Sequence, residues 1–463
     1  MDAAELAFLP ATEIARRVRR ADLSARQLVE AFLGRIERLQ PRLNAFTQIL
    51  SDVALDQARA VDDAARAGRP LGPLAGVPVA VKDIVDIAGV TTTCGAHAAF
   101  HRTPRTDAPL VSRLREAGAI VIGKTNLHEF AYGVTNINPH HGPTRNPWDP
   151  DRIPGGSSGG SAAAAAAGLC AGAVGTDTGG SIRIPASLCG VVGIKPTYGR
   201  VPVDGIVPLS WSLDHAGPMA RTVRDAAVFL DVMAGRAPDR GVAAVLDEVA
   251  DLTGIRVGVP RTFFWERLDD EVEHLAGAAV RMIGDLRAAV RDLDVPYAAY
   301  AGAAAAVVMS VEAAAFHDRR LRTHPQDFGS DVRTRLLRGF FLSGPDYLAG
   351  LKAQAFLRRE FLRVFDQVDV LVTPTTQVPA SPIDEEPESS AGTSLAMSVQ
   401  LTRFTNPFNV TGFPALSVPC GYTRAGLPAG LQIVGPPDGE ATVLKVGAAY
   451  EAAAGWSRRP GLD

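Results

Sequence analysis

Two glycine-rich loops that contain serines, joined by a run of alanines, constrain most strongly how this chain can fold. The loops are Gly155–Ser161 and Gly175–Ser181, and Ala162–Ala167 follows the first. Side chains this small let backbone segments approach closely, so the alanines predict a tightly packed helix behind the first loop. Glycine also lets backbone N–H groups turn toward a neighbouring hydroxyl. Such an arrangement suits acyl transfer, although glycine–serine loops also occur as plain turns or phosphate cradles.

A lysine at the end of an apolar run makes the acyl-transfer interpretation more specific. Residues 77–81 read Val-Pro-Val-Ala-Val, which predicts a strand, and Lys82 ends it. Alternation along the strand places Lys82 on the same face as Ala80. A lysine in an apolar strand avoids the cost of desolvating its charge when it is neutral. A neutral amine can accept a proton, so the chain needs no histidine as its base.

Lys82, the segment GGSSGGS (155–161) and the segment GTDTGGSIRIPA (175–186) together resemble the amidase signature family of serine hydrolases. The resemblance covers most of the chain and is carried also by residues 123–130, 193–200 and 404–409. It implies three catalytic residues, with a cis peptide bond before the second: Ser181 as nucleophile, Ser157 as proton relay after Gly156, and Lys82 as general base.

The residues before Ser181 predict an oxyanion hole. Thr178, Gly179 and Gly180 lack bulk where an oxyanion would approach, so their backbone N–H groups and that of Ser181 are the candidate donors. Three residues are expected to support the site without acting chemically: Ser158, Asp177 and Arg183. We expect the last two to form a buried ion pair that fixes the loop.

Substrate contacts are expected in one short segment. By the resemblance, the carbonyl-side pocket is lined by Tyr132, Gly133, Val134 and Thr135. Other aromatic side chains are candidates for apolar walls, and core packing explains each of them as well: Trp211, Phe404, Phe408 and Phe413.

The expected fold class is α/β. The resemblance implies a mixed sheet flanked by helices on both faces, and alternating strand-like and helix-like runs over 68–240 independently predict an α/β core that carries the triad. Residues 1–67 are expected to be helices packed on this core. Residues 241–345 are expected to be a helical insertion or cap, and 346–463 the C-terminal part of the same domain. The proline- and acid-rich stretch 379–400 is expected to be an irregular loop, either a lid or an ordinary surface loop.

Composition limits the partners. The chain has 463 residues and a net charge of −3, so no basic surplus favours nucleic acid or an anionic membrane. No membrane span or signal peptide is expected. Four scattered cysteines match no zinc spacing, and no phosphate-loop motif is present, so we expect no metal and no cofactor. Reduced core cysteines favour a cytoplasmic protein. The resemblance also allows a homodimer.

Three functions fit this sequence to different degrees. The first is a serine amidohydrolase that acts on small carboxamides, and on aryl esters or carbamates (urethanes), through a Ser181 acyl-enzyme. The second is the glutamine-hydrolysing A subunit of a tRNA-dependent amidotransferase, which residues 328–332 resemble. Residues 401–404 lack the acid expected there for the amino group of glutamine, although Arg333 or Arg335 could bind its carboxylate. The third, an inactive scaffold, fits poorly with an intact triad. The sequence therefore favours the amidohydrolase.

Overall fold

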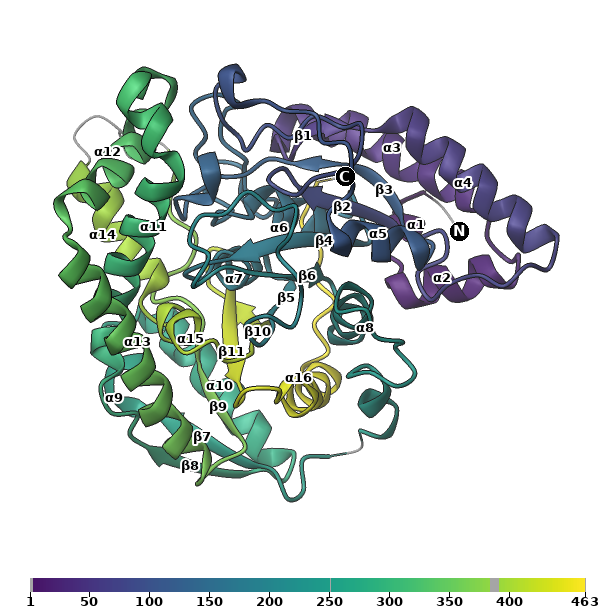
Figure 1. The fold of residues 1–463 in the computed structure, drawn as a ribbon. Coiled ribbons are helices and arrows are strands. Elements are labelled where there is room, and N and C mark those ends of the chain that lie inside the picture. The colour runs from purple at the N-terminus through teal and green to yellow at the C-terminus, as the bar shows by residue number, and fades with distance from the viewer. Residues whose placement is uncertain (1–2, 250, 384–390, 463) are drawn as a thin grey trace.

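One mixed sheet organises the described part of the chain, residues 3–249, 251–383 and 391–462 of the computed structural model (Figure 1). Its eleven strands are, in spatial order, β1 (Phe46–Ile49), β3 (Ile120–Thr125), β2 (Pro78–Lys82), β4 (Gly172–Asp177), β6 (His215–Ala220), β5 (Val192–Lys195), β10 (Ala415–Tyr422), β11 (Pro428–Val434), β9 (Val370–Pro374), β7 (Arg256–Pro260) and β8 (Ala289–Leu293). Strand β2 runs parallel to β3 and β4, and β7 runs parallel to β8 and β9. Between these two parallel groups, each neighbouring pair in the spatial order β4, β6, β5, β10, β11, β9 is antiparallel. The expected mixed α/β sheet is confirmed.

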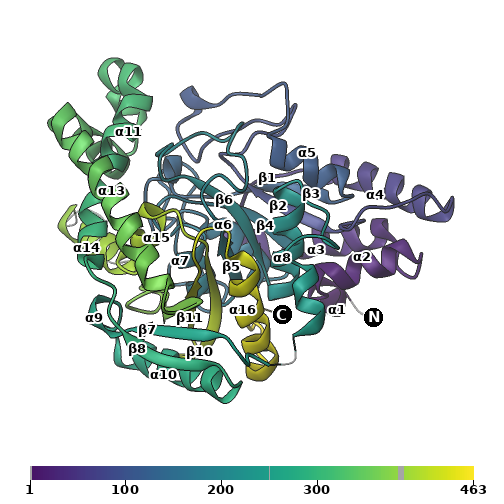
Figure 2. The ribbon, with the colours of Figure 1, turned by 60° about the horizontal axis from the view of Figure 1, so that its bottom comes forward.

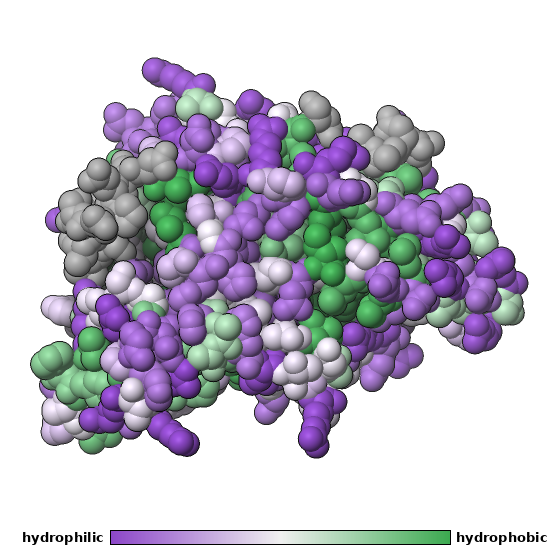
Figure 3. Space-filling model, turned by 90° about the horizontal axis from the view of Figure 1, so that it is seen from above, coloured by the Kyte–Doolittle hydropathy of each residue, from purple (hydrophilic) through white to green (hydrophobic). Residues whose placement is uncertain are grey.

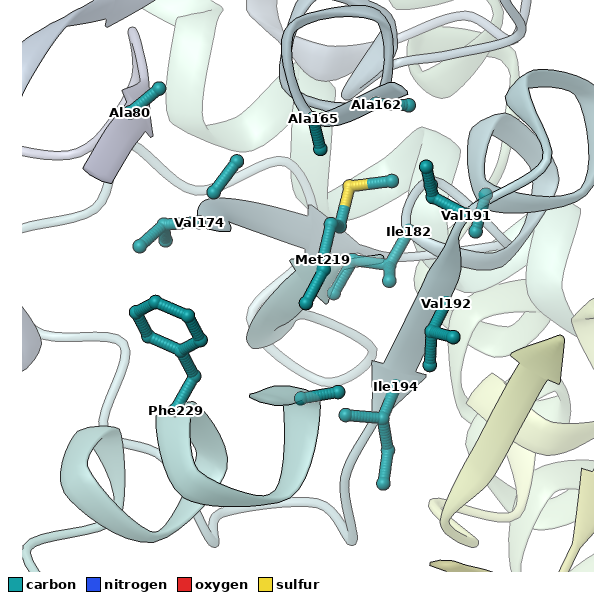
Figure 4. Packing of buried hydrophobic residues seen from close by; sticks show 14 of the residues in the cluster. Ala80, Ala162, Ala165, Val174, Ile182, Val191, Val192, Ile194, Met219 and Phe229 are labelled. Carbon is teal, nitrogen blue, oxygen red and sulfur yellow. The ribbon is translucent and has the colours of Figure 1, made fainter. Parts of the chain in front are cut away.

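Helices cover both faces of this sheet. One face is covered by α6 (Gly159–Ala166) and α7 (Arg183–Cys189). The other face is covered by α8 (Val223–Met233), α10 (Asp270–Asp285) and α16 (Glu440–Ala454), and α5 (Pro109–Glu116) packs against α8. Figure 4 shows α6 and α8 on opposite sides of β4 and β6. Both glycine–serine loops therefore end inside the molecule, between the sheet and the layer formed by α6 and α7.

Two further groups of helices flank the sheet at its sides (Figures 1 and 2). Near β1 lie α1 (Ala3–Ala7), α2 (Ala11–Arg19), α3 (Ala25–Leu43) and α4 (Ser51–Arg66). On the opposite side lie α11 (Ala301–Thr323), α12 (Ser330–Arg338), α13 (Gly344–Phe365), α14 (Ala391–Thr402) and α15 (Asn406–Val410). The short α9 (Arg261–Phe264) follows β7.

The helical expectation for 241–345 needs a correction. This region contains β7 and β8 as well as helices, and the two strands form the end of the sheet. Each strand is only 5 residues long and includes arginine or proline, and the surrounding sequence is rich in Ala and Arg. Such short runs cannot be distinguished from helix by periodicity alone. The boundaries of a helical insertion stay a prediction.

The expected loop 379–400 is also corrected in part, because α14 begins at Ala391. The proline and acid bias ends at Glu388, and residues 389–402 contain no proline and include the helix formers Ala, Leu, Met and Gln. Residues 384–390 lie outside the described residues. A lid at this position stays a prediction.

The alanine run forms the packed helix that its small side chains predict. Every residue of α6 is buried. A Cβ atom on Gly160 would lie 2.3 Å from the Asn126 carbonyl oxygen and 2.5 Å from that of Ala45. Only glycine fits at this close approach, which holds the first glycine–serine loop against β3.

Helix α11 and the turn before it (298–323) are long and apolar enough to cross a membrane by length and composition, with 44% of the apolar window buried. A core helix of an ordinary protein passes the same test. Helix α11 packs on α12, α13 and α15, and it carries the buried carboxylate of Glu312. Seen from above, the surface is mostly polar, with several hydrophobic areas among the polar side chains (Figure 3).

Phe229 provides a test of the core beneath the site. It is 1% exposed and points from α8 toward β4, where a Cβ on Gly172 would lie 2.3 Å from its ring (Figure 4). Replacing it with alanine leaves a cavity, so Phe229→Ala should lower the free energy of unfolding by about 3–5 kcal/mol, measured by urea denaturation. Phe341→Ala is the control, because Phe341 is 88% exposed and its loss should change little. Equal effects of the two variants would contradict this packing.

Candidate active site

The fully buried amine of Lys82 lies at the end of β2, among three hydroxyls. Its Nζ is 2.7 Å from Ser157 Oγ, 2.8 Å from Ser158 Oγ and 2.8 Å from Thr176 Oγ1. Two of these hydroxyls come from the first glycine–serine loop, and the third comes from β4, the parallel neighbour of β2. The structure therefore brings the base and relay candidates into direct contact.

Burial controls the charge of Lys82. It lowers the lysine's pKa from 10.5 to about 7, although Asp177 and Asp214 raise it. The next residue, Asp83, pairs instead with Lys124 at 2.8 Å. Within the described residues Lys82 has no ion-pair partner, so a large fraction of its amine is neutral at neutral pH.

The hydroxyl contacts leave a defined place for the lone pair of a neutral Lys82. The Ser158 hydroxyl donates to the Thr176 carbonyl oxygen at 3.1 Å, so Ser158 Oγ can only accept from Nζ. A neutral amine has two N–H donors and one lone pair. With one donor directed to Ser158, the lone pair can accept a proton from the hydroxyl of Ser157 or of Thr176.

The peptide bond between Gly156 and Ser157 is cis, as the resemblance implies. The Ser158 N–H donates to the carbonyl oxygen of Ser181 at 3.2 Å, which ties the two glycine–serine loops together. Ser181 is 6% exposed, and within the described ranges its hydroxyl makes no hydrogen bond. This hydroxyl is the free nucleophile candidate of the site.

A buried ion pair fixes the loop before Ser181, as expected. Asp177 and Arg183 are both fully buried and are joined at 2.9 and 3.0 Å. Asn409 of α15 also donates to the Asp177 carboxylate, at 2.8 Å. Burial alone would raise the pKa of Asp177, but Arg183 holds it well below its usual range. Asp177 is therefore a permanent anion that organises the backbone around it.

One predicted oxyanion donor is corrected. The N–H of Gly180 donates to Asp177 Oδ1 at 2.8 Å, so it is already engaged. The N–H groups of Thr178, Gly179 and Ser181 make no hydrogen bond to any described residue. The Thr178 side chain is fixed separately, by donation to Asp214 Oδ1 at 2.6 Å. The loop before Ser181 thus keeps three backbone donors that no described group occupies.

The segment 132–135 lies against the first glycine–serine loop. A Cβ on Gly156 would lie 3.0 Å from backbone atoms of Val134 and Asn136. Tyr132 is 8% exposed, and its hydroxyl lies 3.3 Å from Ser310 Oγ of α11. Only glycine fits at position 133, because a Cβ atom there would lie 2.2 Å from the ring of His128. The structure places this segment beside Ser157, and its contact with substrate stays a prediction.

A cleft opens beside these groups. Its polar lining consists of Thr176, Thr178, Asp214 and His215. Most of its other lining side chains are apolar, including Ile84, Val203, Ile206, Val207, Leu209 and Trp211. Phe404, Phe408 and Phe413, which were alternative wall candidates, are fully buried in a separate core cluster. Of the four aromatic candidates, only Trp211 lines this cleft.

Comparison with known proteins decides the family. Residues 27–444 match the family described as Amidase. The chain belongs to the amidase family. This membership makes it a hydrolase of amide C–N bonds.

Relatives in this amidase family have two kinds of name. The chain is 40% identical to the A subunit of the glutamyl-tRNA(Gln) amidotransferase of Chloroflexus aurantiacus, over 99% of both chains. It is 41% identical to an amidase of Pseudomonas putida, over 98% of both chains. A solved structure of 6-aminohexanoate cyclic dimer hydrolase with its substrate is 31% identical, with a TM-score of 0.89 over 98% of this chain and 99% of that chain.

Sequence reasoning missed two residues of this amidase site, Thr176 and Asp214. Thr176 contacts Lys82 only because β2 and β4 are neighbours in the sheet, which the sequence does not specify. Asp214 lies in the loop before β6, and the fold brings its carboxylate to the Thr178 hydroxyl. The position of Thr176 directly before Asp177 in the second motif is the one signal that could have drawn attention to it.

The Asp177–Arg183 pair predicts a large effect on stability. Arg183→Met would leave the Asp177 charge buried without its cation, so the free energy of unfolding should fall by about 3–5 kcal/mol in chemical denaturation. Arg287→Met is the control, because the ion pair of Arg287 with Asp251 is exposed and its loss should change little. An Arg183→Met variant as stable as the control would refute the buried pair.

Proposed function

We propose that this chain is a free-standing amidase that hydrolyses small carboxamides through an acyl-enzyme on Ser181. The observation that carries the proposal is the environment of Lys82. Its amine is fully buried, its pKa is lowered to about 7 by burial, and Ser157 lies 2.7 Å away. A neutral amine next to a serine hydroxyl is a general base that works near neutral pH.

Proton transfer follows the order of these groups. Ser181 gives its proton to Ser157 Oγ as Ser157 passes its own to Lys82 Nζ. Ser181 Oγ then forms a bond to the substrate carbonyl carbon, and the carbonyl oxygen becomes an oxyanion. As the C–N bond breaks, the proton on Lys82 returns through Ser157 to the leaving nitrogen. Water attacks the acyl-enzyme by the same route and releases the acid.

The loop before the nucleophile supplies the electrostatic stabilisation. The N–H groups of Thr178, Gly179 and Ser181 are the proposed oxyanion donors, and preorganised donors of this kind typically contribute 10²- to 10³-fold each to kcat. Asp177 and Arg183 act by holding the loop in place. Tyr132, Gly133, Val134 and Thr135 are proposed to lie along the carbonyl side of the substrate.

The cleft supports an apolar substrate group. Ile206, Val207 and Trp211 line it close to Thr178. A small apolar substituent would bury its surface there, at about 25 cal/mol per Å². Esters and carbamates with such groups pass through the same oxyanion and acyl-enzyme, so we propose them as further substrates.

The residues available for glutamine favour the amidase over the amidotransferase role. Thr402 occupies the segment where an acid is expected, and its hydroxyl donates to the Ser398 carbonyl oxygen at 2.6 Å. Of the two arginine candidates, Arg335 is bound to Asp331 at 3.0 Å, and Arg333 lies 3.5 Å from the Pro325 carbonyl oxygen. Some relatives are named as amidotransferase subunits, so the test of the proposal also covers the amidotransferase role.

The first test is hydrolysis by the purified chain of aryl acylamides, aliphatic amides, 4-nitrophenyl esters, an aryl carbamate and glutamine. Amide turnover without a partner should fall at least 10³-fold in Ser181→Ala, because the nucleophile is lost. Ser187→Ala is the control, because Ser187 lies on α7 with its hydroxyl 3.4 Å from Thr376. Turnover of glutamine alone, or only with partner subunits and tRNA, would favour the amidotransferase role. Amide turnover that survives Ser181→Ala would overturn the nucleophile assignment.

The pH dependence tests the base. The protonated form of Lys82 cannot accept a proton, and its pKa is about 7. We expect kcat/KM to fall about tenfold per pH unit below pH 7 while circular dichroism shows the fold intact. A flat profile down to pH 5 would contradict the role of Lys82.

A further inference from the structure

Glu312 of α11 is a buried carboxylate that the proposed reaction does not use. It is 1% exposed, and it forms no ion pair with any described residue. Its oxygens accept hydrogen bonds from Ser210 Oγ (2.7 Å), the Ser212 N–H (3.0 Å), Ser212 Oγ (2.5 Å) and Tyr347 Oη (2.8 Å). Burying a carboxylate is costly unless donors replace its water, and here four donors do so.

These bonds join two parts of the fold. Glu312 belongs to α11 and Tyr347 to α13, whereas Ser210 and Ser212 belong to the loop that precedes β6. The two serines lie on either side of Trp211, which lines the cleft. The helices beside the site therefore hold the cleft loop through this carboxylate, and Gln354 of α13 adds a longer bond to the Ser212 carbonyl oxygen, at 3.4 Å.

The same loop continues to the nucleophile segment. Asp214 accepts from the N–H groups of Leu209 and Ser210 at 3.0 and 3.1 Å, and from Thr178 Oγ1 at 2.6 Å. An unbroken series of hydrogen bonds thus runs from Glu312 through loop 209–214 to Thr178. Thr178 is three residues before Ser181.

We propose that Glu312 is a positioning residue, which fixes loop 209–214 and through it sets Thr178 and the Trp211 wall of the cleft. This inference builds on the proposed function, because its consequence is the rate of acyl transfer at Ser181. Helix α11 also reaches the site beside Glu312. A Cβ on Gly179 would lie 3.6 Å from Met309 Cε, and Ser310 Oγ lies 3.3 Å from the Tyr132 hydroxyl.

The test replaces one oxygen of Glu312. Glutamine has the same shape, but it has no charge and its amide nitrogen donates instead of accepting. At the oxygen that it replaces, two accepted hydrogen bonds are lost, and the hydroxyls there must turn to accept instead. With the best amide substrate, kcat of Glu312→Gln should fall about tenfold with a smaller change in KM, because a donor misplaced in the transition state lowers kcat. Glu360→Gln is the matched control. Glu360 is a buried glutamate of α13 that pairs with Arg363 at 2.9 Å, and its variant should stay within about twofold of wild type.

A double-mutant cycle tests the route. Glu312 and Asp214 act on the same loop, so Glu312→Gln with Asp214→Asn should lose less activity than the product of the two single losses. The control double variant, Glu360→Gln with Asp214→Asn, should lose activity by the product of its two single losses. If the Glu312→Gln with Asp214→Asn variant lost the full product of the two single losses, the proposal would be overturned.

Hydrogen–deuterium exchange gives a readout that does not need activity. Glu312→Gln should speed exchange in 209–214 and 177–181 relative to Glu360→Gln. If wild type hydrolyses no substrate, the proposed function fails, and exchange alone decides the positioning role. Unchanged exchange in both segments would overturn it. If Glu312→Gln does not fold, Tyr347→Phe removes one donor and should produce a smaller change in the same segments.

Discussion

The burial of Lys82 among three hydroxyls is the interaction on which the site depends. A charged amine at this depth would have no ion-pair partner among the described residues, because Asp83 is bound to Lys124. The fold therefore favours the neutral form. Because the Ser158 hydroxyl donates to the Thr176 carbonyl oxygen, the lone pair of Lys82 is left for a proton from Ser157 or Thr176. Both glycine–serine loops must pass close to one amine for this to happen. Their small residues, and the alanine helix behind the first loop, make that approach sterically feasible.

A permanent buried charge holds the second loop. Asp177 is surrounded by donors from Arg183, Asn409 and the backbone of Gly180. Because Arg183 also reaches Gln432 of β11, at 2.7 Å, the loop is tied to the antiparallel half of the sheet. The parallel half supplies Lys82 and the antiparallel half supplies the anchor. This division explains why the site needs strands from both halves of the sheet rather than one local motif.

The sequence predicted the parts of the site that lie in continuous motifs. The glycine–serine loops, the strand before Lys82 and the Asp177–Arg183 pair were all identified from short segments, and the mixed sheet followed from the resemblance. Contacts that depend on strand order were missed, such as Thr176 beside Lys82. The engagement of the Gly180 N–H depends on how the Asp177 side chain turns, which no sequence pattern encodes. Strands β7 and β8 were hidden because their few residues lie in an Ala- and Arg-rich region.

The chain offers a direct measurement of its central feature. It has only five lysines, Lys82, Lys124, Lys195, Lys352 and Lys445, so lysine labelled with carbon-13 at Cε should give five resolvable NMR signals. The signal absent from Lys82→Met is that of Lys82. We expect this signal to titrate with a midpoint near pH 7, because burial lowers the pKa of Lys82 to about 7. A Lys82 signal that stays at its charged position up to pH 10 would contradict the neutral base, and with it the proposed mechanism.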